Sequence, residues 1–201
     1  MPDSPPIAVI VSRYNASITD RLLDGAREAY ARATGAAGGE GESGGARSAV
    51  SGDGREGGLH VFEAPGAFEL PFLARAAAAT GRYRGVLALG CLIRGETRHD
   101  RYIAQAVAHG ITAASLETRV PIAFGVLTTE TAKQARERAG GEKGNKGAEA
   151  MTALLSTIAA AQAIADGTPG LATAPHPDKA RKDASRSSDS NHANARQGAA
   201  I

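Results

Sequence analysis

The stretch GETRHDRY, residues 95–102, places a lone histidine between two arginines, directly behind a Gly-Glu-Thr turn. His99 is the proton carrier of this group, because imidazole both donates and accepts protons near neutral pH. Glu96 and Thr97 stand where a helix is predicted to begin, and free backbone N–H groups at such a position favour a phosphate or carboxylate. Two alternatives remain open on these residues: a half-buried surface histidine, and ordinary helix capping by Thr97.

Two other segments combine an aromatic ring with polar groups. Tyr14 in SRYN follows an apolar run, and its ring either stacks on a planar heterocycle or caps the edge of a sheet. In APGAFELP, Phe68 and Glu69 are adjacent at a predicted helix start. The pair is suited to a ligand with a ring and hydroxyl groups, whereas the plainer role of Glu69 is to balance the helix dipole.

Three further candidates have simple structural explanations. Arg138 is a cation at a predicted helix C-terminus, and Phe124 lies within a predicted buried strand. Cys91 has no histidine nearby in sequence to activate it and is expected to be a small apolar filler. As the single cysteine, it excludes an intrachain disulfide and a Cys-rich metal site. The five histidines show no metal-ligand spacing, so no metal is predicted.

The elements that position these side chains alternate between strand and helix. Apolar runs predict strands at residues 7–12, 59–64, 85–90 and 121–127. Helices are predicted at residues 17–34, from Pro65-Gly66 to about 80, at about 98–117, after 127, and at about 147–166. Ser17 or Thr19 is expected to cap the first helix, and Thr128 or Thr129 the fourth.

This alternation predicts a three-layer α/β domain, a parallel sheet with helices on both faces. In such folds ligands bind beyond the carboxyl ends of the strands. The segments SRYN, APGAFE, GCLIRGETRH and the residues after FGVLTT all stand at those ends. Their unusual chemistry is therefore expected to meet at one edge of the sheet.

Composition limits the remaining possibilities. The chain has 201 residues, 42% of them hydrophobic, and a net charge of +2, which argues against a nucleic-acid-binding body. No apolar run approaches the ~20 residues of a membrane span, and the N-terminus lacks a basic region, so a secretory signal is not expected. The single cysteine favours a reducing, cytoplasmic setting. One domain is predicted over residues 1–167. It holds a flexible Gly-rich loop at 35–58, with ten of the 25 glycines, and a disordered tail follows at 168–201.

Taken together, these segments resemble the lumazine synthase family. The resemblance rests on IAVIVSRYN, APGAFELP, ALGCLIRGETRH, VPIAFGVLTTET and ERAGGEKGNKG, in this order over roughly residues 7–165. It implies a flavodoxin-like sandwich with a four-stranded parallel sheet. It also implies a transferase of riboflavin biosynthesis that needs no cofactor. The enzyme would condense 5-amino-6-(D-ribitylamino)uracil with 3,4-dihydroxy-2-butanone 4-phosphate to 6,7-dimethyl-8-ribityllumazine, releasing phosphate and water.

The resemblance also implies roles for individual residues. His99 would transfer protons, and Glu96, Thr97 and Arg138 would bind the phosphate. The residues expected to hold the ribitylaminouracil are Tyr14, Ala67, Phe68, Glu69, Cys91, Leu92, Ile93 and Phe124. Phe124 and Arg138 would come from a neighbouring subunit, because sites of this family lie at the interfaces of a homopentamer. Pentamers can assemble further into a capsid.

The sequence departs from the family pattern at several points. Tyr14 stands where phenylalanine or tryptophan is usual, and Asp100 directly follows the histidine where an aromatic residue is usual. The loop at 35–58 and the tail at 168–201 are longer than the family's. The alternative function is a non-catalytic flavin- or lumazine-binding protein, or a capsid-shell protein, on the same scaffold. Small-molecule substrates and copies of the chain are the expected partners, with no nucleic acid and no membrane.

Overall fold

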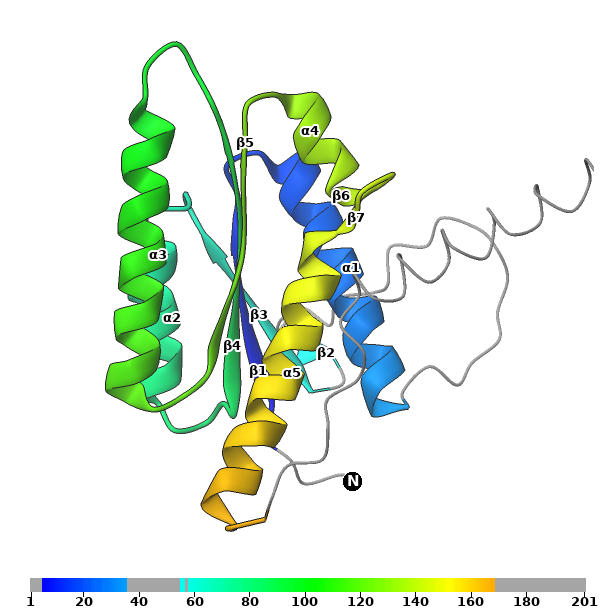
Figure 1. The fold of residues 1–201 in the computed structure, drawn as a ribbon, viewed down its shortest axis with the longest axis vertical. Coiled ribbons are helices and arrows are strands. Elements are labelled where there is room, and N and C mark those ends of the chain that lie inside the picture. The colour runs from blue at the N-terminus through cyan, green and yellow to red at the C-terminus, as the bar shows by residue number, and fades with distance from the viewer. Residues whose placement is uncertain (1–4, 36–54, 57, 169–201) are drawn as a thin grey trace, which may run out of the picture. The chain divides into compact units, whose positions relative to one another are not determined.

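The computed structural model describes residues 5–35, 55–56 and 58–168 (Figure 1). The chain divides into two compact units, Met1–Ala159 and Ala160–Ile201. The second unit contributes only residues 160–168 to the description, which include the end of the last helix. The elements in chain order are β1 Ile7–Ser12, α1 Ala16–Thr34, β2 Arg55–Glu56, β3 Leu59–Ala64, α2 Leu70–Ala79, β4 Gly85–Ile93, α3 His99–Thr118, β5 Ile122–Thr129, α4 Ala132–Glu137, β6 Ala139–Gly141, β7 Gly144–Asn145 and α5 Lys146–Ala165.

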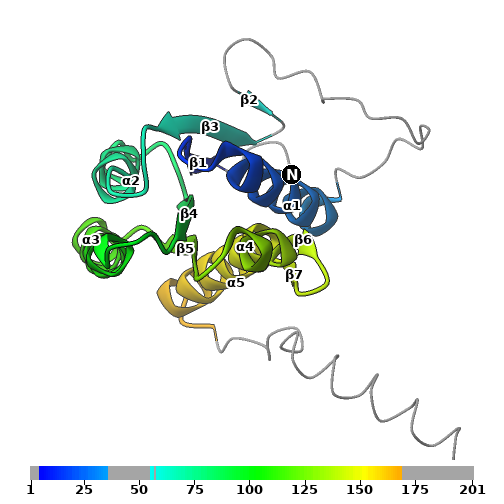
Figure 2. The same cartoon turned by 90° about the horizontal axis from the view of Figure 1, so that it is seen from above.

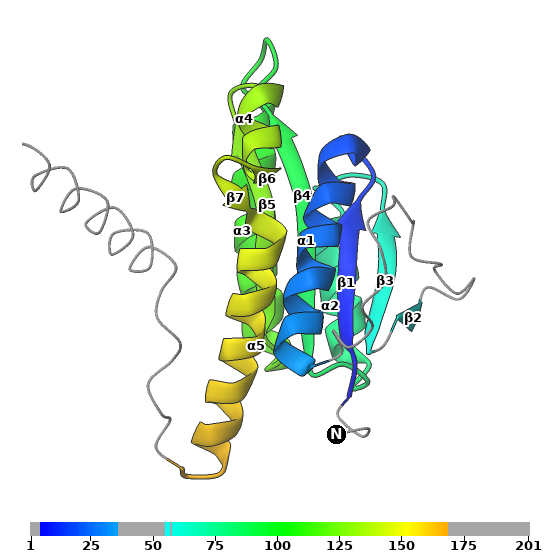
Figure 3. The ribbon, with the colours of Figure 1, turned by 90° about the vertical axis from the view of Figure 1, so that its right-hand side faces the viewer.

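The main sheet has the strand order β2-β3-β1-β4-β5 (Figure 3). Strands β3, β1, β4 and β5 are parallel, so the predicted four-stranded parallel sheet is confirmed. Strand β4 pairs with β1 only as far as Val11 and Leu89, whereas it pairs with β5 to its last residue, Ile93. The carboxyl end of β4 therefore extends beyond its ladder with β1.

Strand β2 lies within the segment predicted as a loop, and the prediction is wrong for these two residues. Arg55 pairs with His60 and Glu56 with Leu59, antiparallel to β3. A chain segment that passes the open edge of a sheet can pair with its free backbone groups, and composition alone does not show this. The described residues leave out most of the predicted loop at 35–58 and the tail after Thr168. The flexibility of the loop and the disorder of the tail therefore stay predictions.

Helices cover both faces of the sheet, as predicted (Figure 2). Strand β1 is buried at every position, and its side chains alternate between two cores. Ile7, Val9 and Val11 belong to the core with α1 and α5, and Ala8 and Ile10 to the core with α2 and α3. Because the central strands are covered on both faces, we expect a ligand site at an end of the sheet.

The first helix begins differently from the prediction of a Ser17 or Thr19 cap. Asn15 occupies the N-cap position with a left-handed backbone, φ 63° and ψ 42°, and makes no side-chain capping bond. The Thr19 hydroxyl donates instead to the carbonyl oxygen of Ser12 at 2.8 Å. The prediction is wrong because the chain turns sharply directly after β1, which places the helix start one residue earlier.

The cap of α4 also differs from the predicted Thr128 or Thr129. Strand β5 continues through Thr129, so both of these residues are part of the sheet. Thr131 caps the helix, and its side-chain oxygen accepts a hydrogen bond from the backbone nitrogen of Gln134 at 3.2 Å.

The segment GNKG, residues 144–147, leads into α5 and contacts α1. Strands β6 and β7 form a small antiparallel hairpin where only a turn was predicted. The Asn145 side chain accepts hydrogen bonds from the backbone nitrogens of Gly147 and Ala148, at 2.8 and 3.2 Å, and so caps α5. Its amide also donates to the carbonyl of Arg21 in α1 at 2.8 Å. A Cβ at Gly147 would lie 1.9 Å from the carbonyl oxygen of Leu22, so only glycine permits this approach of α1 and α5.

Helix α5 is long and apolar enough, by length and composition, to cross a membrane. Its 20 residues include an 18-residue window with a mean hydropathy of 1.3, contrary to the expectation that no segment reaches this length. Many of its residues are alanines, which count as apolar without forming a run of large side chains. Core helices of globular proteins pass the same test, and Ala150, Met151 and Leu154 are buried in the core with α1.

We expect Gly147→Ala to lower the free energy of unfolding by about 3 kcal/mol, because the added methyl group overlaps backbone atoms that cannot move alone. Chemical denaturation followed by circular dichroism measures the loss. The matched control is Gly95→Ala, where an added Cβ meets nothing within 4 Å. Equal stability of Gly147→Ala and the wild type would contradict the close approach of α1 and α5.

Candidate active site

A cavity of about 490 Å³ opens beyond the carboxyl ends of β1, β3 and β4. This volume lies within the usual range for small-molecule sites. Its lining comes from the turn after β1, the segment between β3 and α2, the end of β4 and the start of α3. The cavity thus lies where the strand–helix alternation predicted a ligand site.

Most of the site residues expected from the sequence line this cavity. They are Tyr14, Ala67, Phe68, Glu69, Cys91, Leu92, Ile93, Thr97 and His99. The lining also includes Asn15 and Asp100, which were not among the expected site residues. The expected residues Glu96, Phe124 and Arg138 do not line it.

Two aromatic side chains at the cavity are largely exposed. Tyr14 is 71% and Phe68 is 61% accessible to solvent, although both are large and apolar in part. Neither ring makes a ring contact among the described residues, whose ring contacts all involve Tyr83. Exposed aromatic faces beside a cavity are available to stack on a planar ligand.

Glu69 offers a free carboxylate at the same place. It is the N-cap residue of α2 but makes no side-chain capping bond, and its carboxylate has no hydrogen-bond or ion-pair partner among the described residues. A Cβ at Gly66 would lie 2.9 Å from Glu69 Oε2, so the missing side chain leaves room for the carboxylate. The carboxylate is free to accept hydrogen bonds from hydroxyl groups of a ligand.

The start of α3 carries His99 as its first helical residue. The N-cap residue is Arg98, and no side chain caps the helix, so the alternative of capping by Thr97 is wrong. The first N–H groups of the helix are therefore left without a side-chain partner, and the helix dipole adds a partial positive charge there. His99 is exposed beside these groups and lines the cavity. The arrangement places a proton carrier next to an anion-binding helix start.

An ion pair lies next to this helix start. The Arg94 guanidinium contacts the carboxylate of Glu130 at 2.6 Å, and the backbone nitrogen of Arg94 donates to the carbonyl of Thr129 at 2.9 Å. The Glu130 hydrogen bond and charge raise the pKa of Arg94 above its ordinary value, and Asp100 adds to this rise. Arg94 therefore keeps its charge and joins the end of β4 to the end of β5.

Cys91 lines the cavity as a neutral thiol. The side chain is buried, and burial raises the pKa of the thiol to about 11. A thiol with this pKa is protonated at neutral pH and is a poor nucleophile. The structure thus agrees with the expectation that Cys91 is a small apolar filler.

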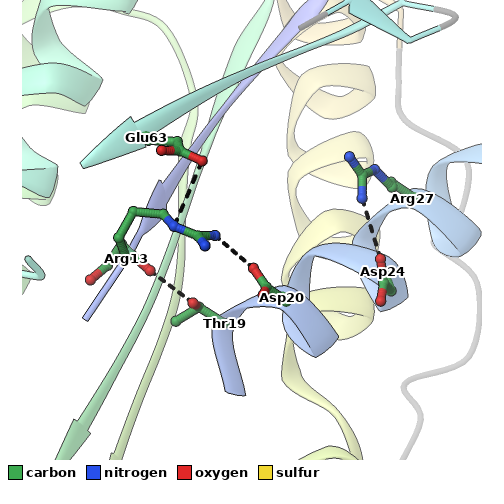
Figure 4. A network of polar contacts seen from close by, with 7 residues as sticks. Arg13, Thr19, Asp20, Asp24, Arg27 and Glu63 are labelled. Atoms are coloured by element: carbon green, nitrogen blue, oxygen red, sulfur yellow. Dashed lines mark hydrogen bonds and ion pairs between the residues drawn. The ribbon is translucent and has the colours of Figure 1, made fainter. Parts of the chain in front are cut away.

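The turn that carries Tyr14 is fixed to β3 and α1 through Arg13 (Figure 4). The Arg13 guanidinium contacts Asp20 of α1 at 2.7 Å and Glu63 of β3 at 3.6 Å. Its backbone nitrogen donates to the carbonyl of Ala64 at 2.8 Å. On the other side, Asn15 Nδ2 donates to the carbonyl oxygen of Cys91 at 3.0 Å.

Asn15 is the lining residue that interpretation of the sequence missed. The available signal was an asparagine directly before a helix, a residue that tolerates a left-handed backbone. The serine and threonine that follow offered equally good capping residues, and nothing local indicates a bond to β4.

Phe124 and Arg138 lie away from the cavity of their own chain. Phe124 is 38% exposed on β5, where it lines two smaller cavities of about 260 and 280 Å³. Strand β5 ends the sheet order, and its outer edge has no strand partner among the described residues. Arg138 is the C-cap residue of α4. Its exposed side chain has no hydrogen-bond or ion-pair partner in the described part of the chain. Glu96 is exposed beside Thr97 but outside the cavity lining.

No group of three or more histidine, cysteine, aspartate or glutamate residues suited to a metal ion occurs within residues 5–35, 55–56 and 58–168. The expectation that the protein holds no metal stays a prediction.

Comparison with known proteins agrees with the geometry. The family model for 6,7-dimethyl-8-ribityllumazine synthase matches residues 42–162. The chain is 41% identical to the 6,7-dimethyl-8-ribityllumazine synthase of Nautilia profundicola over 76% of this chain and 86% of that protein. It is 43% identical to the protein of the same name from Nitratiruptor sp., over 77% of this chain and 88% of that protein.

A third relative is 6,7-dimethyl-8-ribityllumazine synthase 1 of Caulobacter vibrioides, which is 42% identical over 78% of this chain and 90% of that protein. These relatives each match more than three quarters of this chain, and this chain covers more than 85% of each of them. The chain therefore belongs to the 6,7-dimethyl-8-ribityllumazine synthase family.

Proposed function

We propose that the protein condenses 5-amino-6-(D-ribitylamino)uracil with 3,4-dihydroxy-2-butanone 4-phosphate to form 6,7-dimethyl-8-ribityllumazine, in riboflavin biosynthesis. The observation that carries the proposal is the cavity at the carboxyl edge of the sheet. It brings together free aromatic rings, a free carboxylate, an uncapped helix start and His99. The rings and the carboxylate suit a substrate that has a planar ring and hydroxyl groups. The helix start suits a second substrate that has a phosphate.

The ribitylaminouracil binds against the end of β4 in this proposal. The rings of Tyr14 and Phe68 contact the pyrimidine, and Glu69 accepts hydrogen bonds from the ribityl hydroxyl groups. Ala67 and the segment Cys91–Ile93 line the remaining surface, and their backbone groups contact the ring edge.

The butanone phosphate binds at the start of α3. The backbone N–H groups of Glu96 and Thr97 and of the first turn donate to the phosphate oxygens, where the helix dipole also favours a negative charge. Arg138 of a neighbouring copy completes this phosphate site with a guanidinium that has no partner among the described residues of its own chain.

His99 moves protons during the condensation. The amine adds to the ketone carbonyl, and the carbinolamine loses water to give an imine when His99 delivers a proton to the departing oxygen. His99 then removes a proton from the carbon beside the imine, the C–O bond to phosphate breaks, and the resulting enol becomes a ketone. The ribityl-bearing nitrogen adds to this ketone, which closes the ring, and loss of a second water gives the lumazine.

Members of this family are oligomers, and we propose a homopentamer for this chain. Support comes from the edge of β5, which has no strand partner among the described residues, and from the two smaller cavities that Phe124 lines. It also comes from the location of Phe124 and Arg138 outside the active-site cavity. A head-to-tail interface that closes into a ring would bring these two residues to the cavity of the next copy. A cytoplasmic location is also proposed, consistent with a single buried cysteine.

The test of the proposed activity supplies both substrates and follows phosphate release together with the fluorescence of the lumazine product. Production of both at the same rate supports the proposal. Tight binding of the product or a flavin without turnover would overturn it in favour of a binding protein on this scaffold.

We expect His99→Ala to lower kcat by about 10²-fold without abolishing turnover, because positioning of two reactive substrates remains intact. Steady-state kinetics with the two readouts above measure the loss. Complete inactivity of a variant that assembles like the wild type would contradict this role, because it would mean that the reaction depends entirely on the imidazole.

A complementation experiment tests whether Arg138 acts on the neighbouring copy. His99→Ala and Arg138→Ala chains are mixed after unfolding and refolded together in equal amounts. If each site takes His99 from one chain and Arg138 from the next, about a quarter of the sites in a random ring recover both residues. Recovered activity well above that of either variant alone is the expected result, and light scattering checks that the mixture has the assembly size of the wild type. Activity equal to the mean of the two variants would show that both residues act within one chain.

The thiol of Cys91 is expected to react slowly with iodoacetamide at neutral pH and faster as the pH rises toward 11. The sign follows from the raised pKa, because the reactive thiolate forms only as the pH approaches that value. Mass spectrometry of the native protein follows the reaction without ambiguity, since Cys91 is the only cysteine. Urea-unfolded protein is the control and should react at the rate of a free cysteine. Rapid alkylation of native protein at pH 7 would contradict a buried neutral thiol.

A further inference from the structure

We propose that Asn15 is a positioning residue that holds the ring of Tyr14 at a fixed place above the end of β4, and so sets the affinity for the planar ring of the substrate. This inference rests on the proposed function, because it takes the ribitylaminouracil to be the ligand that meets Tyr14. The residue does not itself touch the reacting atoms in this proposal.

The hydrogen bond from Asn15 lies just beyond the point where the backbone pairing of β1 with β4 ends. The ladder between β1 and β4 ends at Val11 and Leu89, whereas Cys91 lies two residues farther along β4. The carbonyl oxygen of Cys91 accepts the Asn15 amide at 3.0 Å, in a partly buried position. A backbone carbonyl at such a position needs a partner, so the side chain of Asn15 extends the contact between β1 and β4 beyond the ladder.

The backbone of Asn15 is suited to this contact. Its φ of 63° and ψ of 42° lie in the left-handed region, which asparagine adopts more readily than most residues. Its carbonyl oxygen accepts hydrogen bonds from the backbone nitrogens of Ile18 and Thr19, at 2.8 and 3.1 Å. The residue is therefore fixed to α1 by its backbone and to β4 by its side chain.

Tyr14 itself has no fixed side-chain contact. Its hydroxyl makes no hydrogen bond among the described residues, and the side chain is 71% exposed. The distance of the ring from β4 thus depends on the contact that ties the turn to β4. Arg13 fixes the turn to β3 and α1 (Figure 4). Among the described residues, the side-chain hydrogen bond from this turn to β4 is that of Asn15.

This difference gives Asn15 a specific effect on one substrate. The distance between the Tyr14 ring and the Cys91–Ile93 segment determines how well a planar ring fits between them. The phosphate site at the start of α3 does not depend on the turn after β1. Loss of the Asn15 amide should therefore weaken binding of the ribitylaminouracil and leave the butanone phosphate unaffected.

The test compares Asn15→Gly with Asn15→Asp and the wild type. Glycine keeps the left-handed backbone and removes the amide, while aspartate keeps the size and directs an oxygen at the Cys91 carbonyl. We expect the KM for the ribitylaminouracil to rise about three- to tenfold in Asn15→Gly, the range that one lost hydrogen bond gives. Asn15→Asp should show a larger rise. The KM for the butanone phosphate and kcat should stay at the wild-type values in both variants.

Arg13→Gln is the matched control, because it removes the ion pairs of the same turn without touching the cavity. It should leave both KM values unchanged. A parallel fluorescence titration gives the Kd of the lumazine product for each variant and needs no turnover. An inactive wild type that binds the product would refute the proposed function, while the titration would still decide the role of Asn15.

Several results would overturn the proposal. Equal changes in both KM values, a fall of kcat alone, or an unchanged Kd in Asn15→Gly would each show that Asn15 does not act through the Tyr14 ring. The same conclusion follows if Arg13→Gln reproduces the effect. Loss of folding in both Asn15 variants, measured by circular dichroism, would show that the bond serves stability instead.

Discussion

The burial of the central strands on both faces is the constraint on which the rest of this structure depends. Strand β1 has no exposed position, and β4 is buried up to its last residue. Side chains on these strands are committed to the two cores, so chemistry is confined to the loops at the carboxyl edge. The cavity, the uncapped start of α3 and the turn of Tyr14 all lie there. The same commitment explains why Cys91, within β4, is a neutral filler.

At this edge, helix ends and charged side chains lack the hydrogen-bond partners that similar groups have elsewhere in the described residues. Helix α4 is capped by Thr131 and α5 by Asn145, but α3 has no side-chain cap. Glu69 and Arg138 likewise have no partner among the described residues. Local rules of stability are commonly broken where function requires it. The unpaired groups at the cavity are complementary to a phosphate and to hydroxyl groups, whereas Arg138 does not line the cavity of its own chain.

Much of the fold could be predicted because its signals are local. The four parallel strands begin within a residue of their predicted starts, since each is a continuous apolar run of the kind that a buried parallel strand requires. Helix caps and short strands could not be predicted in this way. Thr128, Thr129 and Thr131 are chemically equivalent as caps, and only the true length of β5 selects Thr131. The two-residue strand β2 has no signal of its own, because its pairing depends on the free edge of β3.

The sequence by itself determined the order of the four parallel strands and the helices between them, the residue types at the carboxyl edge and the membership of the family. Periodicity and motif spacing are properties of residues close together in the sequence, so they can be recognised without a structure. Only the tertiary structure decided that the Asn15 amide meets the Cys91 carbonyl, and that Phe124 and Arg138 lie outside the cavity of their own chain. These facts depend on the register of β1 against β4 and on the place of β5 at the edge of the sheet. Both are fixed by packing between segments far apart in the chain, for which no local pattern carries a signal.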